Sequence, residues 1–321
     1  MHLPTLRQLQ FLTAVADHGS FSRAAEACNV TQPTLSAGVK ELENLLQVQL
    51  IEREARGASL TRAGIEAVRR ARNVLSESQD LVSAAREAGQ PLVGAFRLGA
   101  IPTVAPFILP KILPQLRNAY PDLRLYLRED RTERLIEDLR NRALDAAIIA
   151  LPWPAHGIES FPLIEDEFLF VGPRDHPLAA RNGLSPDDLS AADVLLLEDG
   201  HCLRDHALSV CSLPGGADKT EISATSLQTL VQMVAGGLGV SLLPKLAADA
   251  GVTAGADVVV RAFTQPVVGR AIGIAVRAGS PRTAEAHLIG DLIRAAFPDR
   301  LAGGAGRANP ADGAGTREPA V

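Results

Sequence analysis

Cysteine is scarce in this chain, with three residues, Cys28, Cys202 and Cys211, among 321. A small and odd number of cysteines argues against the disulfide-scaffolded domains of secreted proteins. No apolar run approaches the roughly 18 residues that a membrane span needs. The segment Met1–Arg7 also lacks the apolar core of a signal peptide. We therefore expect a cytoplasmic protein that does not insert into a membrane.

Excess positive charge is missing as well. Lys and Arg total 32 against 37 Asp and Glu, which gives a formal net charge of -5. Within residues 1–90 the two signs balance, so the acidic excess lies further along the chain. A nucleic-acid-binding function therefore has to rest on a local motif and not on bulk charge. The length corresponds to two or three domains at about 150 residues per domain.

Such a motif lies near the N-terminus. The spacing of apolar residues predicts a helix over residues 5–17, with Thr5 as its N-cap. A short Ala-rich helix is predicted over 21–27, followed by a turn and a third helix that begins after Thr31, with Pro33 in its first turn. Two short helices that meet across a turn are typical of a helix-turn-helix.

The next segments suggest a wing and a long connecting helix. Residues 48–61 alternate loosely between apolar and polar side chains, which indicates a two-stranded hairpin. Residues 62–87 have an apolar stripe and no proline, which predicts a helix that pairs with a partner helix. Gly89-Gln90-Pro91 is expected to form a hinge.

Strand-like and helical segments alternate after this hinge. Strands are predicted at 96–100, 123–127, 146–150, 168–171, 194–197 and 273–276, and helices at 106–118, 132–141 and 227–235. Such alternation favours an α/β region with mostly parallel sheets. Residues from about 301 onward are rich in Gly, Ala and Pro, and we expect them to be disordered.

Two of the three cysteines lie within residues 200–211. Nearby cations stabilise a thiolate, and His201 and Arg204 lie close to Cys202 in the sequence. If this segment were helical, the Cα atoms of Cys202 and Cys211 would be roughly 13 Å apart, at about 1.5 Å per residue. A disulfide needs them within about 7 Å. The two sulfurs could then bond only after the segment refolds, which suits a redox switch better than a permanent crosslink.

Two other interpretations of these cysteines stay open. Both can be buried core residues, as free cysteine often is. His201, Cys202, His206 and Cys211 also supply zinc-type ligands, although their spacing fits no compact zinc-binding pattern. Cys28, in the turn of the helix-turn-helix, is expected to be a packing residue.

The chain resembles LysR-type transcriptional regulators over nearly its whole length. The resemblance to that family's winged helix-turn-helix is carried by residues 21–46, with Ala24-Ala25, Thr31–Ser36 and Leu42-Glu43. Within the family, the chain is most similar to members that sense hydrogen peroxide. That similarity lies in Leu197–Asp205 followed by Cys211, in Ile101–Val104 and in Ala224–Leu227.

The resemblance implies a winged helix-turn-helix at 1–61, a dimerisation helix and hinge at 62–90, and an effector region at 91–300 that is similar to periplasmic binding proteins. It implies two effector subdomains, one at about 91–165 and 268–300 and the other at about 166–267, and a disordered tail at 301–321. It also implies a homodimer or homotetramer on a double-stranded DNA operator, with RNA polymerase as a partner. No cofactor or metal is expected.

The same resemblance implies a redox chemistry. Cys202 would be the peroxidatic cysteine, which hydrogen peroxide oxidises, and Cys211 the resolving cysteine, which forms a disulfide with it. The residues that fall where such relatives orient peroxide and polarise its O–O bond are Thr103, Thr132, His201, Asp205 and Arg270. Glutaredoxin or thioredoxin is the expected reductant, and the chain is expected to be a regulator and not an enzyme.

Candidate DNA contacts lie in the third helix and the wing. Gln can read adenine through two hydrogen bonds, while Ser, Thr, Lys and Arg reach phosphates or base edges. The candidates are Gln32, Pro33, Thr34, Ser36, Lys40 and Arg53.

Two other functions stay open on the sequence. A LysR-type regulator with incidental cysteines would bind a small metabolite in a cleft lined by Thr103, Thr132 and Thr225. A thiol peroxidase is disfavoured because the sequence has no C-x-x-C, G-x-S-x-G or G-x-G-x-x-G motif, and the N-terminal third would have no role.

Overall fold

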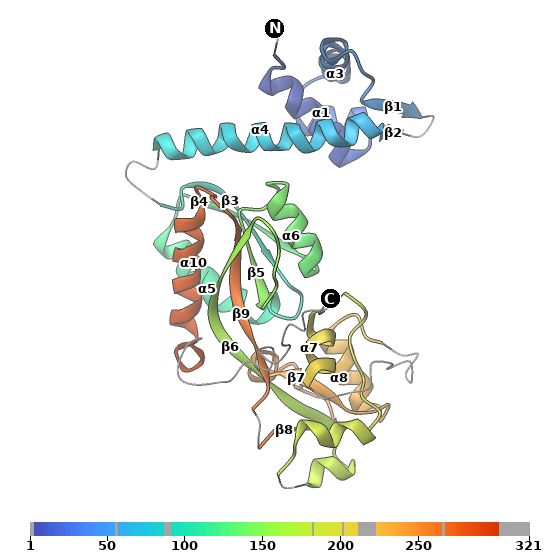
Figure 1. Cartoon of the computed structure of the whole chain (residues 1–321), viewed down its shortest axis with the longest axis vertical. Coiled ribbons are helices and arrows are strands. Elements are labelled where there is room, and N and C mark those ends of the chain that lie inside the picture. Colours follow the sequence, from blue (N-terminus) through green and yellow to red (C-terminus); the bar gives the residue numbers. More distant parts are fainter. Residues whose placement is uncertain are drawn as a thin grey trace, which may run out of the picture.

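The computed structural model describes residues 3–54, 57–86, 91–181, 183–200, 202–210, 223–264 and 267–301. Its N-terminal part is a helical head followed by a hairpin and one long helix (Figure 1). The elements are α1 (Leu6–His18), α2 (Phe21–Ala27), α3 (Gln32–Leu46), β1 (Ile51–Glu54), β2 (Gly57–Leu60) and α4 (Arg62–Arg86). β1 and β2 pair antiparallel. The predicted helix-turn-helix, hairpin and long helix are thereby confirmed.

Side-chain caps begin two head helices at the predicted residues. Thr5 Oγ1 accepts the Gln8 backbone N–H at 3.2 Å, and Gln8 Oε1 accepts the Thr5 backbone N–H at 2.9 Å, which forms a capping box. Thr31 Oγ1 accepts the Thr34 backbone N–H at 3.4 Å at the start of α3. These bonds satisfy N–H groups that a helix start leaves unpaired, so local sequence sets where both helices begin.

Gly38 allows α3 to pack closely against α1. The buried residues of α3 are Leu35, Gly38, Val39 and Leu42. A Cβ atom on Gly38 would lie 2.6 Å from Phe11 Cδ2, much closer than a normal contact. This packing turns the opposite face of α3 toward solvent.

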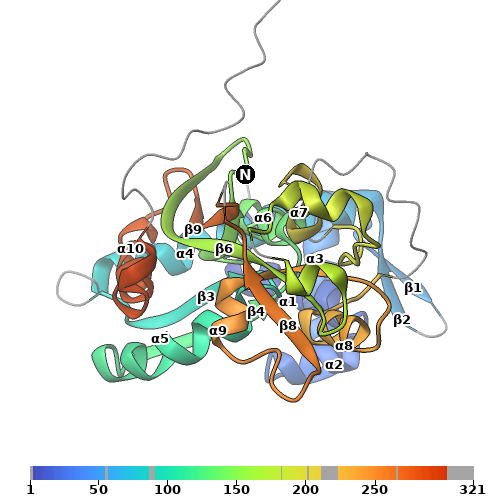
Figure 2. The same ribbon diagram turned by 90° about the horizontal axis from the view of Figure 1, so that it is seen from below.

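Beyond residue 91 the chain forms two subdomains. The first contains β3 (Gly94–Ala100), α5 (Ala105–Ala119), β4 (Leu123–Glu129), α6 (Thr132–Arg140), β5 (Ala146–Leu151) and α10 (Thr283–Ala296). β3 lies between β4 and β5 and is parallel to both. α5 and α10 pack side by side on one face of this sheet, and α6 lies on the other (Figures 1 and 2).

The second subdomain is joined to the first by a shared strand, β6 (Ile158–Pro173). As far as Glu167, β6 pairs with β9 (Gly269–Arg277); from Phe168 onward it pairs with β7 (Ser241–Pro244) and β8 (Val258–Ala262). The other elements of the second subdomain are η1 (Pro177–Ala180), η2 (Pro186–Ala191), α7 (Cys202–Val210), α8 (Leu227–Ala235) and α9 (Lys245–Asp249). A third short 3-10 helix, η3 (Pro298–Arg300), follows α10; η1 and η2 are 3-10 helices as well. Each subdomain has its own cluster of buried apolar side chains.

The α/β class with two subdomains is confirmed, but the expectation of mostly parallel sheets is wrong. β5 with β9, and β6 with β7, β8 and β9, all pair antiparallel. The reason is that β6 leads from the first subdomain to the second and β9 leads back, so the two strands run in opposite directions. Residues 194–197 are buried as predicted, yet only isolated bridges join them to neighbouring segments. Among the described residues, no helix is long and apolar enough to cross a membrane.

Candidate functional site at the contact between the two subdomains

Cys202 lies where the two subdomains meet. It is the first residue of α7, its thiol is free, and only 5% of the residue is exposed. Although α7 belongs to the second subdomain, Cys202 packs into the buried cluster of the first subdomain, whereas its neighbour Leu203 packs into the cluster of the second. Any movement of this thiol therefore changes the contact between the two subdomains.

The segment before Cys202 runs along the start of α6. A Cβ atom on Gly200 would lie 2.9 Å from Arg131 Nη1, and Arg131 Nη2 pairs with Glu198 Oε2 at 3.3 Å. Gly200 has a φ of 85°, a left-handed conformation that glycine adopts at little cost. These contacts place the segment that leads to Cys202 beside the start of α6, whose first residue is Thr132.

Thr103 and Thr132 follow neighbouring parallel strands. β3 ends at Ala100 and β4 at Glu129, and these two residues are directly paired. Because the carboxyl ends of parallel strands meet at one edge of a sheet, both threonines lie at the same edge. Each is 2% exposed, and Thr132 Oγ1 has no hydrogen-bond partner among the described residues. A buried hydroxyl of this kind normally requires a partner, so a small polar molecule at this edge would satisfy it.

Arg270 donates two hydrogen bonds to Thr103. Its Nη1 donates to Thr103 Oγ1 at 2.9 Å, and its Nη2 donates to the Thr103 carbonyl at 3.2 Å. Arginine has no acceptor, so the Thr103 hydroxyl must accept this bond and keeps its own hydrogen for donation elsewhere. The structure therefore brings Thr103 and Arg270 together.

Asp166 anchors Arg270 but was not singled out by the sequence analysis. Its Oδ2 accepts from Arg270 Nε at 3.2 Å and from Nη2 at 3.1 Å, and neither side chain of the pair is exposed. Burial raises the pKa of the Asp166 carboxyl, and the charge of Arg270 opposes that effect. The available signal was the placement of Ile164, Asp166 and Phe168 on one face of β6, because an acid on a buried face implies a buried partner.

Of the two basic residues expected to stabilise a Cys202 thiolate, Arg204 has a carboxylate partner of its own. Arg204 Nε pairs with Asp199 Oδ1 at 2.9 Å, so its charge is already shared with a carboxylate. His206 Nδ1 lies 2.7 Å from the Cys202 carbonyl oxygen.

Three of the residues predicted for the peroxide site have positions or side chains that the structure does not describe. His201 and Cys211 lie outside the described residues. Asp205 belongs to α7, but its side chain lies outside them as well. Within the described part of the chain, no group of three or more His, Cys, Asp or Glu residues could hold a metal ion.

The exposed face of α3 presents most of the candidate DNA contacts. Pro33, Thr34 and Lys40 are exposed; Gln32 is exposed too, and its Oε1 accepts from Ser22 Oγ at 3.0 Å. The remaining two candidates are Ser36, which is half-buried on α3, and Arg53, which lies in β1 with a side chain outside the described residues.

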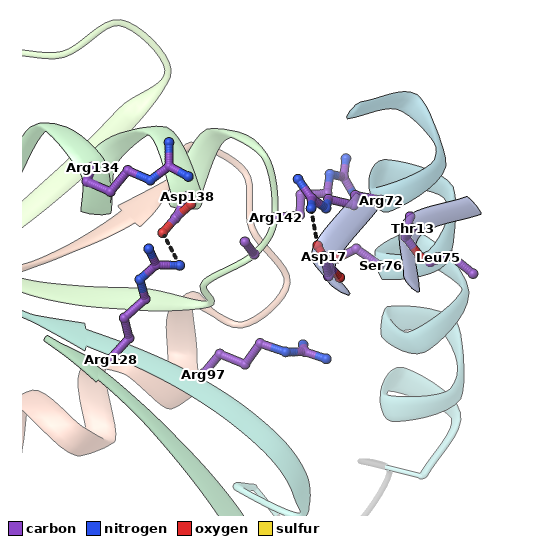
Figure 3. Close-up of a pocket in the computed structure, with 11 residues that line it drawn as sticks. Thr13, Asp17, Arg72, Leu75, Ser76, Arg97, Arg128, Arg134, Asp138 and Arg142 are labelled. Carbon is purple, nitrogen blue, oxygen red and sulfur yellow. Dashed lines mark hydrogen bonds and ion pairs between the residues drawn. The ribbon is translucent and has the colours of Figure 1, made fainter. Parts of the chain in front are cut away.

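A cavity of about 480 Å³ separates the head from the first effector subdomain (Figure 3). Ion pairs border it: Arg72 with Asp17 at 2.5 Å within the head, and Arg128 with Asp138 at 3.0 Å within the effector region. Arg142 crosses from the effector region to pair with Glu77 of α4. Burial raises the pKa of Asp138, and the charge of Arg128 opposes this. No local pattern in the sequence indicates this junction, because residues 17 and 72, and 77 and 142, are far apart along the chain.

Family comparisons agree with both parts of this architecture. A model described as "Bacterial regulatory helix-turn-helix protein, lysR family" matches residues 6–65, and the LysR substrate binding domain matches residues 89–298. The chain belongs to the LysR family. Because this is a family of transcription regulators, membership confirms that the chain is a regulator and not an enzyme.

Similar LysR-family proteins include one from Dickeya chrysanthemi named "Hydrogen peroxide-inducible genes activator", which is 39% identical over 289 residues that cover 90% of this chain and 94% of that protein. The DNA-binding transcriptional dual regulator OxyR of Escherichia coli is 40% identical over 290 residues, which cover 90% of this chain and 95% of that protein. A full-length OxyR variant from Pseudomonas aeruginosa has a TM-score of 0.76 at 38% identity, covering 91% of this chain and 98% of its own. A peroxide-bound OxyR mutant from Corynebacterium glutamicum has a TM-score of 0.65 at 35% identity, covering 93% and 94%. The similarity to peroxide-sensing members of the family is thereby confirmed.

Proposed function

We propose that this LysR-family chain is a transcription regulator that hydrogen peroxide switches through a reversible Cys202–Cys211 disulfide. The observation that carries the proposal is the free Cys202 thiol buried at the contact between the subdomains. Thr103, fixed by Arg270, has a hydroxyl hydrogen to donate, and the unpartnered Thr132 hydroxyl lies at the same sheet edge. A small, uncharged, hydrogen-bonding molecule such as hydrogen peroxide suits this set of groups.

The reaction proceeds in two steps. The Cys202 thiolate attacks one peroxide oxygen, the O–O bond breaks, and the leaving hydroxide takes a proton to become water, which leaves a sulfenic acid on Cys202. The Cys211 thiol then displaces a second water to form the disulfide. Donation from the Thr103 hydroxyl to the leaving oxygen stabilises the charge that develops there, and Arg270 holds that hydroxyl in place. His201 and Asp205 are proposed to complete the peroxide site.

Formation of the disulfide requires α7 to unfold in part. The helix runs without a break from Cys202 to Val210, the residue before Cys211. A continuous helix would hold the two Cα atoms roughly 13 Å apart, and the bond needs about 7 Å or less. We propose that Cys202 leaves the buried cluster of the first subdomain in this step, so that oxidation removes the reduced packing from the ensemble.

The altered subdomain contact is proposed to reposition the heads of a homodimer or homotetramer on a DNA operator in the cytoplasm. The head (1–61) would bind DNA through the exposed α3 residues Gln32, Pro33, Thr34 and Lys40, with Ser36 and Arg53 beside them. The helix and hinge at 62–90 would join the subunits, and the effector region at 91–300 would sense peroxide. RNA polymerase would receive the signal, and glutaredoxin or thioredoxin would restore the thiols.

Footprinting tests the proposal. DNA selected from a random pool by the reduced protein is footprinted before and after stoichiometric hydrogen peroxide, for the wild type, Cys202→Ser and Cys28→Ser. Peroxide should change the footprint of the wild type and of the Cys28→Ser control, and leave that of Cys202→Ser unchanged. A normal peroxide response in Cys202→Ser would refute the proposal. A response to a small carboxylate that ignores both substitutions would instead favour a metabolite-sensing regulator.

A further inference from the structure

Asp166 lies directly opposite Arg270 where the subdomains join. The two residues are partners in the register of β6 and β9, two positions before β6 changes its pairing at Phe168. Both side chains have no exposed surface. The Arg270 guanidinium also lies over the Phe168 ring, with Cζ 5.9 Å from the ring centre. Arg270 is thus enclosed, and its orientation depends on the few polar groups that contact it.

The Asp166 carboxyl group collects hydrogen bonds from separate segments. Oδ2 accepts two bonds from Arg270, and Oδ1 accepts the Leu246 backbone N–H at 2.9 Å at the start of α9. Arg300, in η3, has its Nη1 3.6 Å from Oδ1 and also pairs with Asp249 of α9. Asp166 therefore links both subdomains and the turn after α10 to one guanidinium group.

These contacts fix which edge of Arg270 faces Thr103. A guanidinium group is planar, so binding the Nε and Nη2 edge to Asp166 fixes its plane. Nη1 is then the nitrogen that meets Thr103 Oγ1 at 2.9 Å. Since Thr103 must accept this bond, the position of Arg270 restricts the directions in which the hydroxyl can donate its own hydrogen.

We propose that Asp166 is a positioning residue, which aligns Arg270 and through it the Thr103 hydroxyl for the reaction of peroxide with Cys202. The inference rests on the proposed function, because it assigns a role to Arg270 and Thr103 in that reaction. Apart from Asp166, the polar contacts that the structure gives Arg270 are both on Thr103. Without the carboxylate, the guanidinium loses two of these four bonds and keeps only the two to Thr103.

Asp166→Asn is the most direct test. The side chain keeps its size, but an amide nitrogen replaces one acceptor oxygen, so a donor faces either the Leu246 N–H or Arg270. Misalignment of a reacting group by about 1 Å can cost roughly 100-fold in rate. We expect the second-order rate of Cys202 oxidation by hydrogen peroxide to fall about 10- to 100-fold. The rate of alkylation of Cys202 by iodoacetamide, which does not need the Thr103 hydroxyl, should match that of the wild type.

Glu285→Gln is the matched control. Glu285 is another buried acid of the effector region, paired with Arg282, and it lies in α10, which stands apart from α7 in both views (Figures 1 and 2). Its replacement should leave both rates unchanged. If Asp166 served only to hold the fold together, Asp166→Asn would loosen the packing around Cys202. The alkylation rate of Cys202 would then rise, and the peroxide rate would not change by itself. Equal peroxide rates in Asp166→Asn and the wild type would overturn the inference.

Arg270→Lys keeps the test decisive if Asp166→Asn does not fold. It preserves the positive charge and removes the planar fork that Asp166 and Thr103 share. The same selective loss of the peroxide reaction is expected, and a wild-type peroxide rate in this variant would contradict the role of the aligned fork. Failure of this inference can be told apart from failure of the proposed function, because in the second case Cys202 of the wild type would itself not react with peroxide.

Discussion

Replacing Gly200 with alanine should shift the Cys202–Cys211 equilibrium toward the disulfide. Gly200 has a φ of 85° in the reduced structure, and an L-residue pays roughly 1–2 kcal/mol for a left-handed conformation. The added Cβ would also meet Arg131 Nη1 at 2.9 Å, the far end of a flexible side chain that can move aside. We expect this strain to be present only in the reduced state, because the segment before α7 changes conformation when the disulfide forms.

The magnitude follows from this strain. A change of about 1–2 kcal/mol alters an equilibrium about 5- to 30-fold. For a two-electron couple, about 30 mV corresponds to 1.4 kcal/mol, so the midpoint potential should become more negative by about 20–45 mV. Equilibration with glutathione redox buffers, followed by trapping of thiols and mass spectrometry, measures the midpoint.

Gly237→Ala is the control for this experiment. Gly237 has a φ of 77°, and a Cβ atom there would meet nothing within 4 Å. This substitution imposes similar backbone strain after α8, so it should lower the stability of the fold and leave the redox midpoint unchanged. An unchanged midpoint in Gly200→Ala would refute the reasoning, because it would mean that this conformation persists in the disulfide form.

Three further predictions concern the head. Burial raises the pKa of the Cys28 thiol, and Arg7 opposes this, so its thiolate fraction at neutral pH is below that of a free cysteine. Its alkylation rate should therefore keep rising with pH beyond the range where a free thiol levels off, as peptide mass spectrometry would record; a free-cysteine profile would contradict this. Lys40→Ala should reduce the slope of log K against log salt for DNA binding by about 1, measured by fluorescence anisotropy. An unchanged slope would show that Lys40 does not contact DNA phosphates. Gly38→Ala should destabilise the head by about 1–3 kcal/mol in chemical denaturation because of the 2.6 Å approach to Phe11, and adding Phe11→Leu should recover part of the loss.

Local signals predicted the head more fully than the effector region. The capping bonds of Thr5 and Thr31 form between residues three positions apart. The starts of α1 and α3 can therefore be predicted from a few neighbouring residues. The antiparallel pairing of β6 with β9 joins residues more than 100 positions apart and left no local pattern. α10 was not predicted either, although its buried side covers the first subdomain.

The candidate site shows the same limit. Thr103 and Arg270 were identified through the resemblance to a family, and their hydrogen bond spans 167 positions in the sequence. Asp166 stands between Glu165 and Glu167, in an acidic run that suggests a solvated surface. The alternating burial of β6 shows that the middle acid faces inward while its neighbours are partly exposed.

Peptide mass spectrometry of the reduced protein after stoichiometric hydrogen peroxide tests the central claim most directly. With free thiols alkylated, the account predicts a loss of two hydrogens that maps to a bond between Cys202 and Cys211, leaves Cys28 free, and reverses with dithiothreitol. If Cys202 and Cys211 both remain alkylatable after peroxide treatment, the account of a peroxide switch is contradicted.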